Sequence, residues 1–152
     1  MSWRVIVALA VALAIGSIAT GCGLGDSSDP APTKAAFVKR GDAICEKIPS
    51  RYLNRYNDLR EEQKGKSLPP KAAKEEQNLK SAVPPLRTAT AEFEELGAPE
   101  GDEEQVEAII AALEKGADGI EADPGSELSG PKSPLASFAK LTGENGLKAC
   151  QL

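Results

Sequence analysis

The sequence predicts an all-α fold: a small antiparallel bundle of about four helices, kinked at prolines and cross-linked by one disulfide. Apolar residues recur at spacings of mostly three, four and seven along four segments of the 152-residue chain, as they do on one face of a helix. No stretch alternates apolar and polar residues with a period of two, which is the pattern of a half-buried strand. Glycines, prolines and capping residues separate the four segments.

The first predicted helix begins after Thr33, a suitable N-cap residue, and its pattern ends at Gly65. Its apolar face consists of Phe37, Ile44, Cys45, Ile48, Tyr52, Tyr56 and Leu59. Pro49 lies inside this pattern. Because a proline costs about 3 kcal/mol in a helix interior, we expect a kink near residues 46–48.

The second predicted helix covers residues 71–96 and is interrupted by Pro84 and Pro85. Its apolar face consists of Leu79, Val83, Leu86, Thr90, Phe93 and Leu96. Because neither proline has a backbone N–H, we expect either a bend at this point or two shorter helices.

The third predicted helix follows a clear break at residues 97–101 and ends before Asp123. Asp102 has the position of an N-cap, and Gln105 has the spacing of a capping box. The apolar face consists of Val106, Ile109, Ile110, Leu113, Ala117 and Ile120.

The last predicted helix follows a polar loop at residues 126–132 and ends at Gly146. We expect Ser133 to cap it and Pro134 to occupy its first turn, where a missing N–H costs nothing. The residues expected to face inward are Leu135, Phe138, Leu141 and Thr142.

Residues 1–21 have the pattern of a signal peptide of the lipoprotein type. The uncharged run from Val5 to Ala19 is about 15 residues long, shorter than the roughly 18–20 of a transmembrane helix. The segment from Ala19 to Cys22 resembles the bacterial lipobox, although Leu is more usual where Ala19 stands. We expect cleavage before Cys22 and lipidation of its thiol. The alternatives are ordinary cleavage, which would release a soluble protein, and retention of the segment as an uncleaved anchor.

Residues 22–33 form a predicted flexible tether, because Gly, Ser, Asp and Pro cannot bury enough apolar surface to fold. The r.m.s. reach of such a chain is about 18 Å. The helical domain of residues 34–152 would therefore stay close to the membrane surface.

The chain has three cysteines, and an unpaired thiol is a reactive liability in an exported protein. Lipidation of Cys22 would leave Cys45 and Cys150 to pair, since exported compartments are oxidising. A bridge that closes a loop of roughly 105 residues stabilises a fold by up to about 4.7 kcal/mol in the chain-entropy model. The alternative is that both thiols are buried and unpaired.

The composition argues against catalysis and against nucleic acid as a partner. The chain has no histidine, which excludes Ser-His-Asp and Cys-His catalysis and metal sites built on imidazole. Its acidic stretches do not match the 12-residue calcium loop. We therefore expect no enzyme activity, no cofactor and no metal site. A net charge of −5 and 4% aromatic residues are poorly suited to nucleic acid.

Charge is distributed unevenly along the chain. Residues 34–80 contain 12 Lys/Arg and 7 Asp/Glu, whereas residues 92–152 contain 4 and 14. One interpretation is that basic helices pair with acidic helices inside the bundle. In the other, a basic face near the tether contacts anionic lipid or wall polymer. That face would consist of Lys39, Arg40, Lys47, Arg51, Arg55 and Arg60.

Three motifs resemble those of one protein family. Phe37–Cys45 matches F-x-x-x-A/G-D-A-I-C, Leu96–Glu103 matches L-G-x-P-x-G-D-E, and Gly146–Cys150 matches G-L-K-x-C. They span about residues 36–150 and resemble small helical exported lipoproteins of high-GC Gram-positive bacteria, which are uncharacterised. The resemblance implies the Cys45–Cys150 bridge and no activity. Pro49 and Asn145 depart from the family pattern.

These observations predict a non-catalytic binding or structural module, anchored by lipid to the extracytoplasmic face of the cell membrane. Its partner would be an envelope protein, an anionic lipid or a wall polymer, and no oligomeric state is predicted. The alternative is a carrier of a small apolar ligand, with a cavity opened between helices by kinks at Pro49 and at Pro84-Pro85.

Overall fold

All regular structure is helical in the part of the chain that the structure describes, residues 30–67 and 69–151 of a computed structural model. The all-α prediction is confirmed. The elements are α1 (Lys34–Glu62), α2 (Pro70–Gln77), the π-helical turn η1 (Asn78–Ala82), α3 (Val83–Leu96), α4 (Glu103–Ala122), α5 (Ala136–Glu144) and the 3-10 turn η2 (Lys148–Cys150). The predicted signal peptide, Cys22 and the tether up to residue 29 lie outside the described residues.

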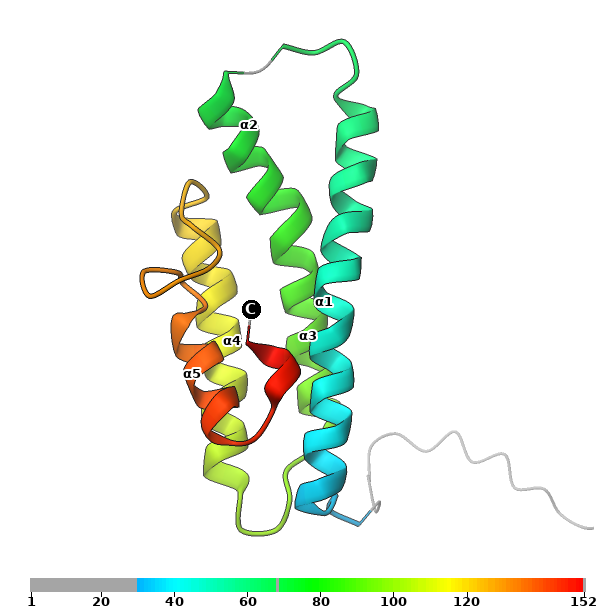
Figure 1. Cartoon of the computed structure of the whole chain (residues 1–152), viewed down its shortest axis with the longest axis vertical. Helices are drawn as coiled ribbons and strands as arrows, with labels where there is room; N and C mark the ends of the chain where they lie inside the picture. The colour runs from blue at the N-terminus through cyan, green and yellow to red at the C-terminus, as the bar shows by residue number, and fades with distance from the viewer. Residues whose placement is uncertain (1–29, 68, 152) are drawn as a thin grey trace, which may run out of the picture.

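Figure 1 shows how the helices are arranged. The chain runs along the long axis in α1, returns through α2, η1 and α3, and turns back again in α4. The helix α3 packs against both α1 and α4, and the short α5 packs against α4. The η2 turn then brings the C-terminal segment back to α1 and α5. Among the described residues, no helix has the length and apolar character needed to cross a membrane.

The start of α1 is as predicted. Thr33 is the N-cap, and its hydroxyl accepts a hydrogen bond from the N–H of Ala36 at 3.2 Å. The helix continues through Pro49 as a single element and ends at Glu62, shortly before Gly65, which has a φ of +81°. A proline removes one helical hydrogen bond, but buried residues on both sides of Pro49 hold the helix against the core.

The π-helical turn η1 joins α2 to α3 immediately before Pro84 and Pro85. An interruption was predicted here, and its form is a widened turn in which the N–H of Val83 donates to the carbonyl of Asn78, five residues earlier. The two prolines have no N–H, and their rings crowd the carbonyls four residues before them. The wider turn relieves this crowding while the chain stays helical.

The same turn makes one sequence-based assignment wrong. Leu79, which the spacing placed on the apolar face, is 39% exposed, whereas Asn78 is 2% exposed. A π turn has a hydrogen-bond spacing of five rather than four, so an apolar pattern of threes and fours does not continue through it. The residues after the turn follow the prediction: Val83, Leu86, Thr90 and Phe93 are buried, and Leu96 packs against the core.

Two predicted N-caps differ from the structure. Asp102 precedes α4, but its side chain makes no capping hydrogen bond and instead pairs with Lys34 Nζ at 2.9 Å, so the predicted capping box does not form. The last helix begins at Ala136 rather than after Ser133. The reason is a turn in which the Ser133 hydroxyl accepts from the N–H of Leu135 at 3.1 Å.

Three phenylalanines from different helices form the centre of the core. Phe37 of α1, Phe93 of α3 and Phe138 of α5 are fully buried. The ring centroid of Phe93 lies 6.4 Å from that of Phe37 and 6.3 Å from that of Phe138. Aromatic pairs at this separation contribute about 0.5–1.5 kcal/mol beyond their burial, so this cluster fixes how the helices pack.

Candidate functional site: an apolar pocket beside the π turn

An open pocket of about 300 Å³, here called the apolar pocket, lies between α1, the η1–α3 segment and the loop before α5. Its walls are almost wholly apolar, and they consist of Ile48, Pro49, Tyr52, Ala82, Leu86, Leu128, Ser129 and Leu135. Small-ligand sites have volumes of about 300–1,000 Å³. The pocket therefore suits one small apolar group and offers it almost no hydrogen-bond partner.

The pocket lies beside Pro49 and beside the π turn that precedes Pro84 and Pro85. Pro49 lines it on α1, and Ala82, the last residue of the π turn, lines it on the facing segment. The small side chain of Ala82 leaves space that a larger residue would fill. The expected cavity opened by kinks at both Pro49 and Pro84-Pro85 stays a prediction, because only Pro49 lines this pocket. Pro84 and Pro85 themselves line a separate, more polar hollow.

One wall of the pocket was missed by the sequence analysis. It is formed by the loop that joins α4 to α5, residues 123–135, here called the pocket loop. The stretch 126–132 was expected to be a polar connection. Leu128 is the signal that could have found this wall, because it is a large apolar residue in an otherwise polar and Gly/Pro-rich segment. In the structure Leu128 packs against the core.

Asn78 connects the π turn to the pocket loop. Its Nδ2 donates to the carbonyl oxygens of Pro124 at 2.6 Å and Ser126 at 3.2 Å. Asn78 is buried, and a buried amide that loses its partners costs about 1–3 kcal/mol. The exposed ion pair between Lys74 and Glu127, at 3.9 Å, contributes little in comparison.

Tyr52 forms the side of the pocket that faces α2. Its hydroxyl accepts a hydrogen bond from Gln77 Nε2. The ring of Tyr56 lies nearly parallel to it, with centroids 6.2 Å apart, and the guanidinium of Arg60 lies 5.8 Å from the centre of the Tyr56 ring. Both tyrosines are partly exposed. These contacts on both sides fix the orientation of the Tyr52 ring.

The six basic residues predicted to form a contact face have different environments. Arg51 makes two hydrogen bonds to Glu92 of α3, one of them at 3.1 Å, and Lys47 Nζ lies 4.0 Å from the same carboxylate. The hydrogen bond from Arg51 holds the pKa of Glu92 below its ordinary value, against the opposing effect of burial. The residues of this set that make no ion pair with any described residue are Lys39, Arg40, Arg55 and Arg60.

A further ion-pair group joins α3 to α4. Arg87 donates hydrogen bonds to Asp118 and to Glu121, the second at 3.2 Å. The hydrogen bond to Asp118 raises the pKa of Arg87. Ion pairs between helices therefore engage Lys47, Arg51 and Arg87. The side chains of Lys39, Arg40, Arg55 and Arg60 remain exposed on the surface.

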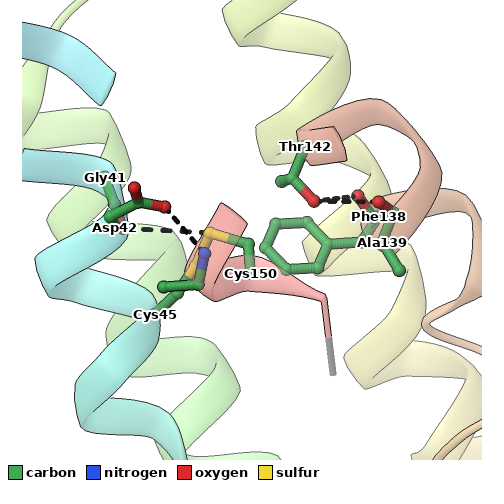
Figure 2. The surroundings of a disulfide bond; sticks show 8 residues. Gly41, Asp42, Cys45, Phe138, Ala139, Thr142 and Cys150 are labelled. Carbon is green, nitrogen blue, oxygen red and sulfur yellow. Dashed lines mark hydrogen bonds between the residues drawn. A yellow bond between two sulfur atoms is a disulfide. The ribbon is translucent and has the colours of Figure 1, made fainter. Parts of the chain in front are cut away.

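The disulfide joins Cys45 of α1 to Cys150 of η2 (Figure 2), with the two Cα atoms 5.0 Å apart. Both residues are fully buried. Next to the bridge, the carboxylate of Asp42 accepts a hydrogen bond from the N–H of Ala149 at 2.9 Å. The C-terminal turn is therefore attached to α1 by a covalent bond and by a hydrogen bond on the same side.

The segment that leads to the disulfide packs closely at Gly41. A Cβ atom on Gly41 would lie 2.2 Å from Leu147 Cδ2 and 3.1 Å from Phe93 Cε1. Leu147 is fully buried, and its N–H donates to the carbonyl of Thr142 at 2.9 Å. The Thr142 hydroxyl lies within hydrogen-bond distance of two carbonyls of its own helix (Figure 2). This region is structural and leaves no open site around the sulfur atoms.

No cluster of three or more ligating side chains suited to a metal ion occurs among residues 30–67 and 69–151. Comparisons of the chain with protein-family models, with curated proteins and with solved structures find no match. The resemblance to small exported lipoproteins therefore stays a prediction, and the apolar pocket is the feature on which a functional proposal can be based.

Proposed function

We propose that this chain is a non-catalytic binding module of the cell envelope, and that the apolar pocket is its binding site for a small, uncharged apolar ligand. The observation that carries the proposal is the pocket itself: an open hollow of about 300 Å³ with almost wholly apolar walls. An exposed concavity with apolar walls is a feature that binding sites share.

The chemistry of the walls limits the ligand. The pocket is lined by carbon-rich side chains and by no Lys, Arg, Asp or Glu. A charged group placed there would lose its hydration without gaining a partner, so the part of the ligand that enters is uncharged. For a ligand of about ten non-hydrogen atoms, an intermediate efficiency of roughly 0.4–0.8 kcal/mol per atom corresponds to a Kd between roughly 1 μM and 1 mM.

The predicted lipid anchor at Cys22 would hold this module at the extracytoplasmic face of the membrane, where apolar ligands are available. Mass spectrometry of the mature N-terminus tests this part of the proposal. We expect Cys22 as the first residue, carrying a diacylglyceryl group. A free Cys22 thiol or a different first residue would contradict it.

Ligand binding can be tested with the full chain in lipid nanodiscs and the neutral fluorescent probe N-phenyl-1-naphthylamine. Ser129→Trp places a large ring at the pocket from its exposed, loop-borne wall. Ser137→Trp is the matched control, because Ser137 is exposed on α5 and does not line the pocket. Probe fluorescence is measured against empty nanodiscs.

We expect saturable probe binding by the unaltered chain, a loss of affinity of about tenfold or more in Ser129→Trp, and no comparable loss in Ser137→Trp. Binding that does not exceed that of empty nanodiscs, or equal affinity in the two variants, would overturn the proposed function.

A further inference from the structure

A second apolar feature lies beside the pocket, on the outer side of α1. Leu53 is 53% exposed, the largest exposed fraction of a big hydrophobic side chain among residues 30–67 and 69–151. Pro49, one turn before it, is exposed, and Tyr56, one turn after it, is half-buried. Together with Arg60 they have the spacing i, i+4, i+7 and i+11, which places all four on one side of a helix. These four residues are here called the contact face.

The contact face is continuous with the apolar pocket. Pro49 belongs to both, and Tyr52 lines the pocket at their border, with its ring nearly parallel to that of Tyr56. Leu53 itself takes no part in the hydrophobic core. A single exposed leucine is common on a protein surface, but an exposed apolar area that joins a pocket is typical of an interaction surface.

The charge carried by the contact face is positive. Arg60 is exposed, and its guanidinium lies 5.8 Å from the centre of the Tyr56 ring. From Pro49 to the end of α1, each acidic residue lies about 110° or more around the helix axis from the centre of the face; these residues are Asp58, Glu61 and Glu62. The first and the last of them line a separate hollow. Across the pocket, the charge of Glu127 is balanced by Lys74 at 3.9 Å.

Leucine, tyrosine and arginine on one face suit the surface of an anionic bilayer. Leucine inserts among the acyl chains, tyrosine lies at the level of the headgroups, and arginine is attracted by anionic lipid. The chain before α1 carries the predicted lipid anchor at Cys22, eleven residues before Thr33, so a bilayer is within reach. Leu53 lies about 30 Å along α1 from Thr33. Contact therefore requires α1 to lie along the membrane rather than to stand upright on it.

We propose that the contact face rests on the anionic lipid surface to which the chain is tethered, with α1 along the bilayer. The apolar pocket then opens at the level of the headgroups, beside Pro49. This inference rests on the proposed function, because it needs the lipid anchor at Cys22.

The test uses the full chain in phosphatidylglycerol nanodiscs that contain doxyl-labelled lipid, a quencher confined to the bilayer. A fluorescent NBD label is attached at Asn57→Cys, which is exposed beside the contact face, or at Ala111→Cys, which is exposed on α4. The helix α3 lies between α4 and α1. The unaltered chain is the labelling control and should take up no label, since its cysteines are lipidated or joined in the disulfide.

Two glutamate variants test the face itself. Leu53→Glu places a negative charge at its centre, and Asn54→Glu is the matched control, because Asn54 is an exposed neighbour about 100° away around the helix. We expect strong quenching of the label at residue 57 and little at residue 111. Leu53→Glu should lower the ratio of bound to free face, measured from quenching at residue 57, by about tenfold. Asn54→Glu should leave that ratio nearly unchanged, and phosphatidylcholine in place of phosphatidylglycerol should lower it.

The outcomes separate this inference from the function beneath it. Equal quenching of the two labels, equal effects of the two glutamate variants, or the same contact on phosphatidylcholine would overturn the contact face. Absence of probe binding would overturn the pocket as a binding site and leave the contact face supported by its own quenching result. A mature chain without lipid at Cys22, detected by mass spectrometry, would overturn the anchor and the contact face with it.

Discussion

Replacement of Gly41 by alanine tests how closely the C-terminal segment packs on α1. The added methyl would lie 2.2 Å from Leu147 Cδ2 and 3.1 Å from Phe93 Cε1. Real Cβ contacts are about 3.4 Å or longer, so one partner must move by more than an ångström. Both partners are fully buried, and neither can turn towards solvent.

Two opposing effects determine the magnitude. Overpacking a filled core costs about 1–3 kcal/mol, and so short an approach puts Gly41→Ala at the upper end of that range. Against this, alanine is more favourable than glycine in a helix by about 0.8–1.0 kcal/mol. We expect a net loss of about 2 kcal/mol in the free energy of unfolding.

Gly143→Ala is the matched comparison. Gly143 is also helical, but its added Cβ would meet only the side-chain amide of exposed Gln151, at 2.7 Å. A flexible exposed side chain can move aside, so we expect helix propensity to prevail and stability to stay constant or rise by up to about 1 kcal/mol. Urea unfolding followed by circular dichroism measures both variants.

A double variant identifies the contact. Leu147→Ala alone should cost about 2–5 kcal/mol through the cavity that it leaves. In Gly41→Ala/Leu147→Ala, the new methyl partly fills that cavity. The stability lost in the double variant should therefore be smaller than the sum of the losses in the two single variants. Strictly additive losses, or a Gly41→Ala variant as stable as the unaltered chain, would refute the packing argument.

Two further predictions concern the links between helices. The Cys45–Cys150 disulfide joins residues 105 positions apart in the sequence. Its reduction frees the unfolded chain from this cross-link and should lower the free energy of unfolding by up to about 4.7 kcal/mol. Equal urea midpoints for oxidised and reduced protein would contradict this. Glu92→Gln should lower stability near neutral pH by about 1 kcal/mol. Because Arg51 lowers the pKa of folded Glu92 from 4.5, the difference should be present above that value and disappear as the pH falls through the lowered pKa; a difference that persists in acid would exclude the ion pair as its cause.

Helix order and most of the core could be predicted from local pattern alone. Thr33, the breaks at residues 97–101 and the inward position of Phe138 follow from caps, glycines and spacing, which act within a few residues. The errors have two causes: a contact between residues far apart in the sequence, and a helical turn with irregular hydrogen bonding. Asp102 fails as a cap because Lys34, at the start of another helix, attracts its carboxylate. Leu79 is exposed because the two prolines that follow it convert one turn to π geometry.

The candidate site likewise has a part that could be predicted from the sequence and a part that could not. Its two helical walls could be anticipated, because prolines within helices signal irregular packing at Pro49 and near Ala82. The loop wall could not, since the placement of Leu128 depends on Asn78, some 50 residues earlier in the chain, reaching the carbonyls of Pro124 and Ser126. No short-range pattern encodes a hydrogen bond between a helix and a distant loop.

The position of the disulfide has a consequence for proteolysis. Every connection between the helices, from the turn after α1 to the turn before η2, lies between Cys45 and Cys150. Loops are the preferred sites of proteolytic cleavage, and a single cut in any of these loops would open the ring without dividing the molecule. Both fragments would remain joined through the buried sulfur atoms. A nicked chain would thus keep its C-terminal turn covalently attached to α1.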